Sequence, residues 1–452
     1  MTARDHRLPA PSSPPGFRDD LRDLVFHSSG ALVMRVMRAL SSFVFNLVLA
    51  PTLGAGGTGA YFLTRGVTEL ATVVACVGMD TTAVRLLAGG EGRTRVFYRR
   101  ALALVTVVGL LVTALVLAAA PLVCLTFFGE TALINPLRIM ALGIVPWALA
   151  IIYASLLQGA GKIGLSIVIR FVALFLAAIP FLLVFGRNGS LEGAALAHVG
   201  ATVSIFVVGA LAWRRTVDQG FTLSDHNLAP GRWRAAVSAG LSLCSIGLLS
   251  AASGLADTFL LGTLGTMEDV GTFRVAWRIA ALGGAALEAV RLAIAPRMAA
   301  YHSRGEWRAL EQTGRAGTTL AVVLTAPYWL IVLAFPREVL GLFGTEFTVA
   351  VAATMVLVIG RLVSTVTGPV STLLTMAGLE RPLRNLTIVA TVLRVVLLSL
   401  AIPVWGVLGA AVVSCVADVA TSIAATILVR RKLGIVLLPL PRSVLPYRPD
   451  QA

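Results

Sequence analysis

The hydrophobic pattern of the chain consists of long apolar runs that recur from one end to the other. Clear examples are 101–123, 163–185, 320–335 and 386–404. A helix needs about 20 mainly apolar residues to cross a bilayer, and these runs approach or exceed that length. The pattern predicts about twelve transmembrane helices, over 28–50, 58–84, 101–123, 131–158, 163–185, 191–213, 238–262, 270–296, 316–335, 347–376, 383–403 and 406–429.

Positive charge alternates from loop to loop between these spans. Arg and Lys gather in both tails and in the loops on the same side of the membrane, such as 85–100 and 297–315, whereas the opposite loops hold only Arg187 and Arg337. Cationic loop residues favour the cytoplasmic side. The sequence therefore predicts a multi-pass membrane protein with an even number of spans and both termini in the cytoplasm.

The two halves of the chain resemble each other. Residues 52–54 and 59–62 match residues 263–265 and 271–273. Further matches in register are Phe128-Gly129 with Phe343-Gly344, Leu156-Leu157 with Leu373-Leu374, and Gly193-Ala194-Ala195 with Gly409-Ala410-Ala411. A nearly constant offset of about half the chain indicates a tandem duplication.

Each half then holds six spans, an even number, so the two repeats are parallel. We expect an all-α polytopic membrane protein in which two parallel six-helix bundles place a substrate site between them. The predicted divisions are a cytoplasmic tail with an interfacial helix (1–27), an N-terminal bundle (28–213), a cytoplasmic linker (214–237), a C-terminal bundle (238–430) and a cytoplasmic tail (431–452).

Composition excludes a soluble protein. The chain is 57% hydrophobic and 13% charged, whereas soluble domains carry about 25% charged residues. The net charge of +15 is accounted for by the cationic loops, so no nucleic-acid partner is expected. The four cysteines show no CxxC spacing and no neighbouring histidine cluster. No metal and no other cofactor are therefore expected.

Arginines inside the predicted spans are the main candidates for function. A charge near the bilayer centre costs about 3 kcal/mol or more, so it must face a watery cavity, pair, or reach the interface. Arg361, Arg394 and Asp418 lie near the middle of their spans, with a structural pair between Arg394 and Asp418 as the alternative. Arg138 and Arg274 lie near the external ends of theirs, where they can reach the interface.

The first span of each half carries a polar face. Arg35, Arg38, Ser42 and Asn46 follow helical spacing, and the repeat places Asp257 opposite Asn46. In the second span, Arg65 and Glu69 lie four residues apart, so they face a cavity or form a pair of their own. Because Arg outnumbers the acids in the spans and binds phosphate bidentately, the sequence favours an anionic, phosphorylated substrate.

Three segments of the chain look like the start of Wzx-type oligosaccharide flippases: 30–36, 45–54 and 59–62. These flippases belong to the MOP superfamily, together with MATE drug exporters and the lipid II flippase MurJ. The resemblance implies a V-shaped pair of bundles that moves a polyprenyl-diphosphate-linked oligosaccharide across the bacterial inner membrane by alternating access, for surface polysaccharide biosynthesis. It also implies that cavity arginines contact the diphosphate, and the matching positions are Arg35, Arg38, Arg65, Arg278 and Arg361.

The resemblance further marks Asp257 as a candidate ligand for a coupling ion, H+ or Na+, because some relatives carry an acidic residue in the seventh span. The expected partners are the lipid-linked glycan, membrane lipids and the glycan polymerase or assembly machinery, with a monomer as the expected state. The alternative interpretation within the superfamily is a MATE-like, cation-coupled antiporter of drugs or metabolites. A membrane glycan polymerase or ligase is the enzymatic alternative, but it needs placed acids, bases or metal ligands in a sizeable loop. We therefore expect a transporter and not an enzyme.

Overall fold

The computed structural model describes residues 29–88, 95–186, 188–219, 221 and 230–439. Every regular element within these residues is helical. The elements are α2 (Ser29–Cys76), α3 (Met79–Ala88), α4 (Arg95–Phe127), η1 (Thr131–Leu133), α5 (Ile134–Ala141), α6 (Ile144–Gly159), α7 (Ile163–Ile167), η2 (Val168–Val172), α8 (Ala173–Phe185), α9 (Leu191–Asp218), α10 (Pro230–Leu264), α11 (Met267–Gly283), α12 (Ala285–Ser303), α13 (Trp307–Ala334), α14 (Pro336–Gly341), η3 (Thr345–Ala350), α15 (Val351–Thr367), α16 (Val370–Met376) and α17 (Glu380–Leu433).

These helices account for the predicted membrane crossings. Eight described helical segments are long and apolar enough to cross a bilayer, and two bent pairs, α5 with α6 and α11 with α12, raise the number to ten. Two of these ten segments each consist of two helices, because α2 is broken at Gly54 and α17 at Gly406. Counting the two parts of each gives twelve crossings, in agreement with the hydrophobic pattern.

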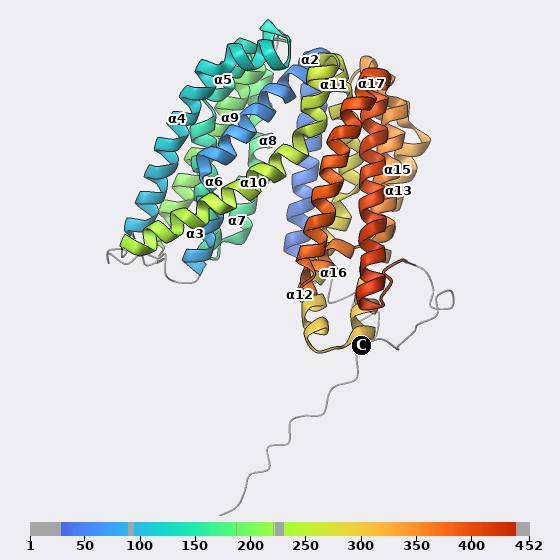
Figure 1. Cartoon of the computed structure of the whole chain (residues 1–452). Helices are drawn as coiled ribbons and strands as arrows, with labels where there is room; N and C mark the ends of the chain where they lie inside the picture. Colours follow the sequence, from blue (N-terminus) through green and yellow to red (C-terminus); the bar gives the residue numbers. More distant parts are fainter. Residues whose placement is uncertain (1–28, 89–94, 187, 220, 222–229, 440–452) are drawn as a thin grey trace, which may run out of the picture.

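The breaks in α2 and α17 turn the chain back across the membrane. Gly54 has φ 70° and Gly406 has φ 53°, a backbone region that favours glycine because it has no Cβ. We refer below to the first part of α2 (29–53) and its second part (55–76), and to the first part of α17 (380–405) and its second part (407–433). In Figure 1 both turns lie at the upper end of the molecule, which we call the apex; the opposite end, where α12 and α17 end, is the base.

Two bundles of helices stand side by side, with α3 to α9 in one and α11 to α17 in the other (Figure 1). They approach each other at the apex and diverge toward the base, and α10 runs diagonally between them. The duplication is visible where the bundles touch. Gly59 in the second part of α2 and Gly271 in α11, which the sequence repeat pairs, bring the two backbones into direct contact.

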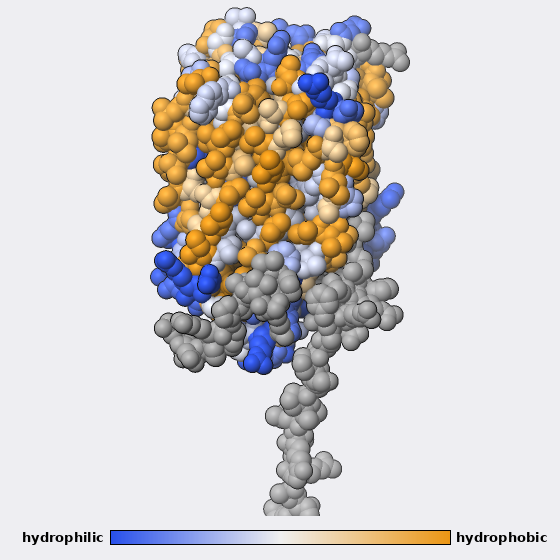
Figure 2. Space-filling view, turned by 90° about the vertical axis from the view of Figure 1, so that its right-hand side faces the viewer, coloured by the Kyte–Doolittle hydropathy of each residue, from blue (hydrophilic) through white to orange (hydrophobic). Residues whose placement is uncertain are grey.

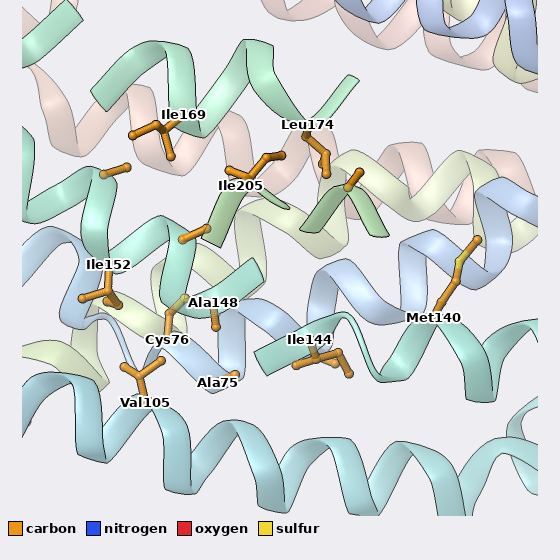
Figure 3. Close-up of a cluster of buried hydrophobic side chains, with 14 of the residues drawn as sticks. Ala75, Cys76, Val105, Met140, Ile144, Ala148, Ile152, Ile169, Leu174 and Ile205 are labelled. Atoms are coloured by element: carbon orange, nitrogen blue, oxygen red, sulfur yellow. The ribbon is translucent and has the colours of Figure 1, made fainter. Parts of the chain in front are cut away.

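Three clusters of buried side chains hold this arrangement. One fills the N-terminal bundle, where Figure 3 shows Met140, Ile144, Ile169 and others converging from separate helices. A second joins the two bundles, since Leu63 of α2 belongs to the same cluster as Phe273 and others of the C-terminal bundle. The third lies in the C-terminal bundle. Figure 2 shows a broad apolar belt between hydrophilic ends, which is the surface expected to face lipid.

Helices and buried residues extend into two of the segments predicted as linker or tail. Helix α9 continues to Asp218 and α10 begins at Pro230, so both extend into the predicted linker 214–237. In the predicted C-terminal tail, Ile435 and Leu437 are buried against the third cluster, and Nε of Arg315 donates to the carbonyl of Val436 at 3.0 Å. The predicted N-terminal tail and interfacial helix, 1–27, lie outside the described residues.

Candidate functional site: a cationic cavity between the bundles

A cavity of about 790 Å³ lies between the two bundles. Its wall combines residues of α2 and α8 from the N-terminal half with residues of α10, α11, α12, α15, α16 and α17 from the C-terminal half. The site therefore lies at the interface of the two repeats, as the duplication predicts. A second chamber of about 410 Å³ extends into the N-terminal bundle and shares Arg38, Arg65, Glu69 and Phe175 with the first.

Three arginines form the centre of this site. Arg65 comes from the second part of α2, and Arg274 and Arg278 come from α11, where their four-residue spacing places both on one helix face. Among the described residues, none of the three has a carboxylate within ion-pair distance. The Nε atoms of Arg274 and Arg278 are also buried without an acceptor. Three guanidinium groups thus face the cavity with hydrogen-bonding capacity to spare.

Aromatic rings hold these guanidinium groups in place. The Arg65 guanidinium carbon lies 5.1 Å from the centre of the Phe175 ring, and that of Arg274 lies 4.7 Å from the centre of Phe62. Arg278 lies 5.5 Å from the Trp277 ring. Cation–π contacts orient the guanidinium planes without neutralising their charge. The site is consequently both cationic and preorganised.

A chain of ion pairs lies deeper in the C-terminal bundle. Arg394 binds Asp257 bidentately, with Nε donating to Oδ1 at 3.0 Å and Nη2 donating to Oδ2. The same guanidinium lies 3.8 Å from Asp418 Oδ1, and Asp418 Oδ2 lies 3.5 Å from Nη1 of Arg361. Ser414 accepts a further hydrogen bond from Arg394. These acids and arginines largely neutralise one another, unlike the three central arginines.

The structure brings most of the predicted site residues to the cavity wall. These are Arg38, Arg65, Glu69, Arg278, Arg361, Arg394 and Asp418. The guanidinium of Arg38 also lies 4.7 Å from the Phe171 ring centre. Arg35 lies in α2, but its side chain is outside the described residues. The pairing of Arg394 considered from the sequence differs in one respect: its closest partner is Asp257, and Asp418 is second.

Two predicted polar residues lie away from the cavity wall. Asn46 is fully buried near the apex, and its Nδ2 donates to the carbonyl of Ser42 at 2.6 Å. Asp257 is buried behind Arg394, with only 6% of its side chain exposed. Neither residue is among the described residues that line the cavity. Glu69 is exposed to the cavity, and it forms no ion pair with Arg65 in the described part of the chain.

Sequence reasoning missed several residues of the site. Arg274 was expected near an external span end, yet it lines the cavity and its Nη1 donates to Thr258 at 3.3 Å. The signal was available, because Arg274 and Arg278 share a face with no acidic residue beside them. The aromatic residues Phe62, Phe175 and Trp277 were also missed, since rings in apolar spans carry no distinctive pattern.

A family model described as polysaccharide biosynthesis protein matches residues 28–302, more than half of the chain. The chain belongs to the polysaccharide biosynthesis protein family. A second model, named MatE, matches residues 243–437 of this family member. The two family matches agree with the resemblance to the MOP superfamily that the sequence predicts.

One curated relative of this family member is the probable low-salt glycan biosynthesis flippase Agl15 of Haloferax volcanii. It is 27% identical over 157 residues, which is 34% of this chain and 33% of the relative. The match therefore spans about a third of the relative's length.

Solved structures share the fold across almost the whole chain. An inward-facing multidrug resistance MATE transporter of the MOP superfamily has a TM-score of 0.70, with 16% identity over 90% of this chain and 98% of its own. The lipid II flippase MurJ in an inward closed conformation also has a TM-score of 0.70, with 11% identity over 90% of this chain and 87% of its own. At these identities the similarity establishes the transporter fold alone.

Proposed function

We propose that this protein moves a polyprenyl-diphosphate-linked oligosaccharide from one leaflet of the membrane to the other, for the biosynthesis of a surface polysaccharide. The observation that carries the proposal is the cluster of Arg65, Arg274 and Arg278 on the wall of the cavity between the bundles, three guanidinium groups with no carboxylate within ion-pair distance among the described residues. Such groups favour an anion, and a diphosphate offers several oxygens to bidentate donors. Membership of the polysaccharide biosynthesis protein family supports the same class of cargo.

The charge distribution supports an orientation for this transport. Cationic residues lie at or beside the helix ends that reach the base, including Arg100 in α4, Arg215 in α9, Arg304 after α12 and Arg431 in α17. The positive-inside rule assigns that side to the cytoplasm. The protein then resides in the inner membrane with both termini in the cytoplasm. The cavity between the diverging ends of the bundles receives its cargo from the cytoplasmic leaflet.

Alternating access follows from the same geometry. Near the apex the bundles are joined by the contact of Gly59 with Gly271 and by the cluster that contains Leu63 and Phe273. We propose that binding of the diphosphate draws the arginines of both bundles together, closes the base and opens this apical contact. The sugars cross in the cavity while the isoprenoid chain stays in the bilayer.

Translocation in proteoliposomes tests this function. A fluorescent polyprenyl-diphosphate glycan is placed in both leaflets, and the fraction that a membrane-impermeant quencher can reach is followed with time. We expect the exchange between leaflets to be much faster with the protein than in protein-free vesicles, and to be competed by unlabelled diphosphate lipid. Exchange no faster than in protein-free vesicles would contradict the proposal.

A MATE-like antiporter is the second candidate. The MatE match over residues 243–437 and the rings of Phe62, Phe175 and Trp277 in the cavity favour it. An organic cation would, however, be repelled by the three guanidinium groups beside those rings. Uptake of ethidium driven by a proton or sodium gradient in the same vesicles, combined with no exchange of diphosphate lipid, would move the assignment to the antiporter.

Transport should not depend on sodium through Asp257. Both carboxylate oxygens of Asp257 are bound by the guanidinium of Arg394, so Na+ would have to displace a tethered cation that donates two hydrogen bonds. We expect replacement of Na+ by N-methyl-D-glucamine to change the translocation rate by less than about twofold. A larger sodium effect that disappears in Asp257→Asn would show that Asp257 does bind the ion. A sodium effect that persists in Asp257→Asn would place the ion elsewhere.

A further inference from the structure

Helix α10 forms an unusually thin part of the cavity wall. Only 11% of the residues in its most apolar stretch are buried, against 22 to 44% in the other seven long apolar helical segments of the described chain. Ser250 and Gly254 line the cavity, whereas Leu249 on the opposite face is exposed on the outer surface. A single helix therefore separates the cavity from the surrounding lipid at this level.

The base end of α10 is attached to the N-terminal half of the molecule. A Cβ on Gly78 would lie 2.0 Å from the carbonyl oxygen of Gly240, so these two backbones touch. Further up, the Cys244 thiol lies 3.5 Å from the carbonyl oxygen of Val73, and Phe259 packs against Gly66. Helix α10 thus follows the second part of α2 along most of its length.

The first part of α17 lies opposite α10 in this part of the cavity wall and is attached to the C-terminal bundle. We call α10 and the first part of α17 the two edges. At its base end, Leu383 packs on the third buried cluster. Thr387 and Thr391 line the cavity, while Val389 on the outer side is 64% exposed. This wall is also one helix thick.

Toward the apex the two helices are connected by an ion pair. Asp257 in α10 binds Arg394 in α17 bidentately. Below this pair, each helix follows a different bundle, and the bundles diverge (Figure 1). This part of the cavity wall is therefore bounded by α10 on one side and by the first part of α17 on the other, with the Asp257–Arg394 pair at its apical end. On the other side of the cavity, α12 packs against α2.

We propose that this part of the cavity wall, between α10 and the first part of α17, is the lateral portal through which the lipid-linked diphosphate reaches the cavity from the leaflet at the base. The inference rests on the proposed function and adds the route and the position of the isoprenoid chain. The edges carry small hydroxyl and backbone groups at Ser250, Gly254 and Thr387, past which a hydrated head group can slide. The outer faces are apolar, as the isoprenoid chain requires.

Photocrosslinking tests where the isoprenoid chain lies. The photoreactive residue p-benzoylphenylalanine replaces Thr387 or Ser250 in the full chain, and in matched controls it replaces Leu330 of α13 or Leu111 of α4, both exposed on the outer surface. Radiolabelled polyprenyl diphosphate should label the two edge positions at least about fivefold more strongly, a difference that corresponds to specific occupancy above random lipid contact. Excess unlabelled polyprenyl diphosphate should remove only the edge signal. Equal labelling at all four positions overturns the portal.

A pair of substitutions on one helix tests the route itself. Gly254→Trp places a large ring at the cavity edge, where no heavy atom lies within 4 Å of an added Cβ, whereas Ala252→Trp places it on the exposed side of α10. We expect Gly254→Trp to slow translocation of the long-chain lipid at least about tenfold and Ala252→Trp to change it less than about twofold. Equal rates in the two variants overturn the proposal.

A short, water-soluble isoprenyl diphosphate separates this proposal from the function on which it rests. Such a probe reaches the arginines from the open base without passing sideways between helices. Solubilised Gly254→Trp should therefore bind geranyl diphosphate as the native protein does, which also shows that the variant is folded. If Gly254→Trp loses that binding while the native protein keeps it, the ring disturbs the arginine site itself, and the portal proposal is overturned. No binding by the native protein would contradict the proposed function instead.

Discussion

Replacing Arg278 with glutamine should lower the rate of diphosphate-lipid translocation by about ten- to a hundredfold. Arg278 lines the cavity between the bundles, and its guanidinium has no carboxylate within ion-pair distance among the described residues. A charge-assisted hydrogen bond to a ligand contributes about 1.5 to 3 kcal/mol, which corresponds to this range. Arg278→Glu should have a larger effect because it adds repulsion to the loss of the bond.

Two controls make this prediction specific. Arg138→Gln removes an exposed arginine that lies outside the described cavity wall, and it should leave the rate within about twofold. Arg361→Gln removes a cavity arginine that already lies 3.5 Å from Asp418, so we expect a smaller loss than for Arg278→Gln. Equal losses in Arg361→Gln and Arg278→Gln would mean that an arginine with a carboxylate neighbour contributes as much to substrate binding as Arg278 does.

The fold could be predicted because its information is local. An apolar run of about 20 residues in a membrane has one stable form, a helix that satisfies its own backbone groups. Charge alternation between loops then limits how the helices alternate in direction, and the repeat indicates two equivalent bundles. The positions of turns such as Gly54 and Gly406 are less apparent, since the structure shows continuous helices broken at a single residue.

The sequence predicts part of the charged lining of the cavity, but not the pairings of these residues. A buried charge is costly wherever it sits, so the mid-span arginines had to face a cavity or a partner. Which of the two applies depends on helices far apart in sequence: Arg394 pairs with Asp257 across 137 positions. Helical spacing could place the polar face of α2, but it could not reveal that the cavity ends below Asn46.

Arg274 was misjudged for a related reason. The sequence gives the depth of Arg274 only relative to the end of a predicted span, which treats the membrane boundary as the nearest water. In the structure the cavity reaches up along α11, so Arg274 meets the cavity while Thr258 accepts one of its hydrogen bonds. Sequence distance to a span end is therefore a poor measure of hydration in a protein with an internal cavity.

Replacing either glycine of the apical contact with alanine should force the two bundles apart at the apex. A Cβ on Gly59 would lie 1.9 Å from the carbonyl oxygen of Met267, and a Cβ on Gly271 would lie 1.9 Å from that of Ala55. Both obstacles are helix backbone, which cannot rotate away as a side chain can. Small residues permit such close helix approach in membranes, and the two positions are related by the duplication. Gly59→Ala and Gly271→Ala should therefore have the same effect.

The expected effect is a shift toward a form open at the apex, measured by labelling from the apical side. A cysteine replaces Ser250 on the cavity wall in a chain whose four native cysteines are changed to alanine, and a membrane-impermeant maleimide is added outside. Labelling should rise at least about fivefold in Gly59→Ala and Gly271→Ala, because an overpacked contact of this kind costs about 1 to 3 kcal/mol. Translocation should fall in both, since return to the form open at the base becomes unfavourable.

Gly56→Ala is the matched control for this experiment. Gly56 lies one turn from Gly59 in the same helix, but an added Cβ there would meet only the Glu268 side chain at 3.7 Å, an ordinary contact. Alanine also favours a helix over glycine by about 1 kcal/mol, so this variant should be as stable as the native protein and label at the native rate. If Gly59→Ala and Gly271→Ala behave like Gly56→Ala, the glycine contact does not hold the apex closed. The gate would then have to be sought in the side chains around Leu63 and Phe273, where substitution to alanine removes packing instead of adding a clash.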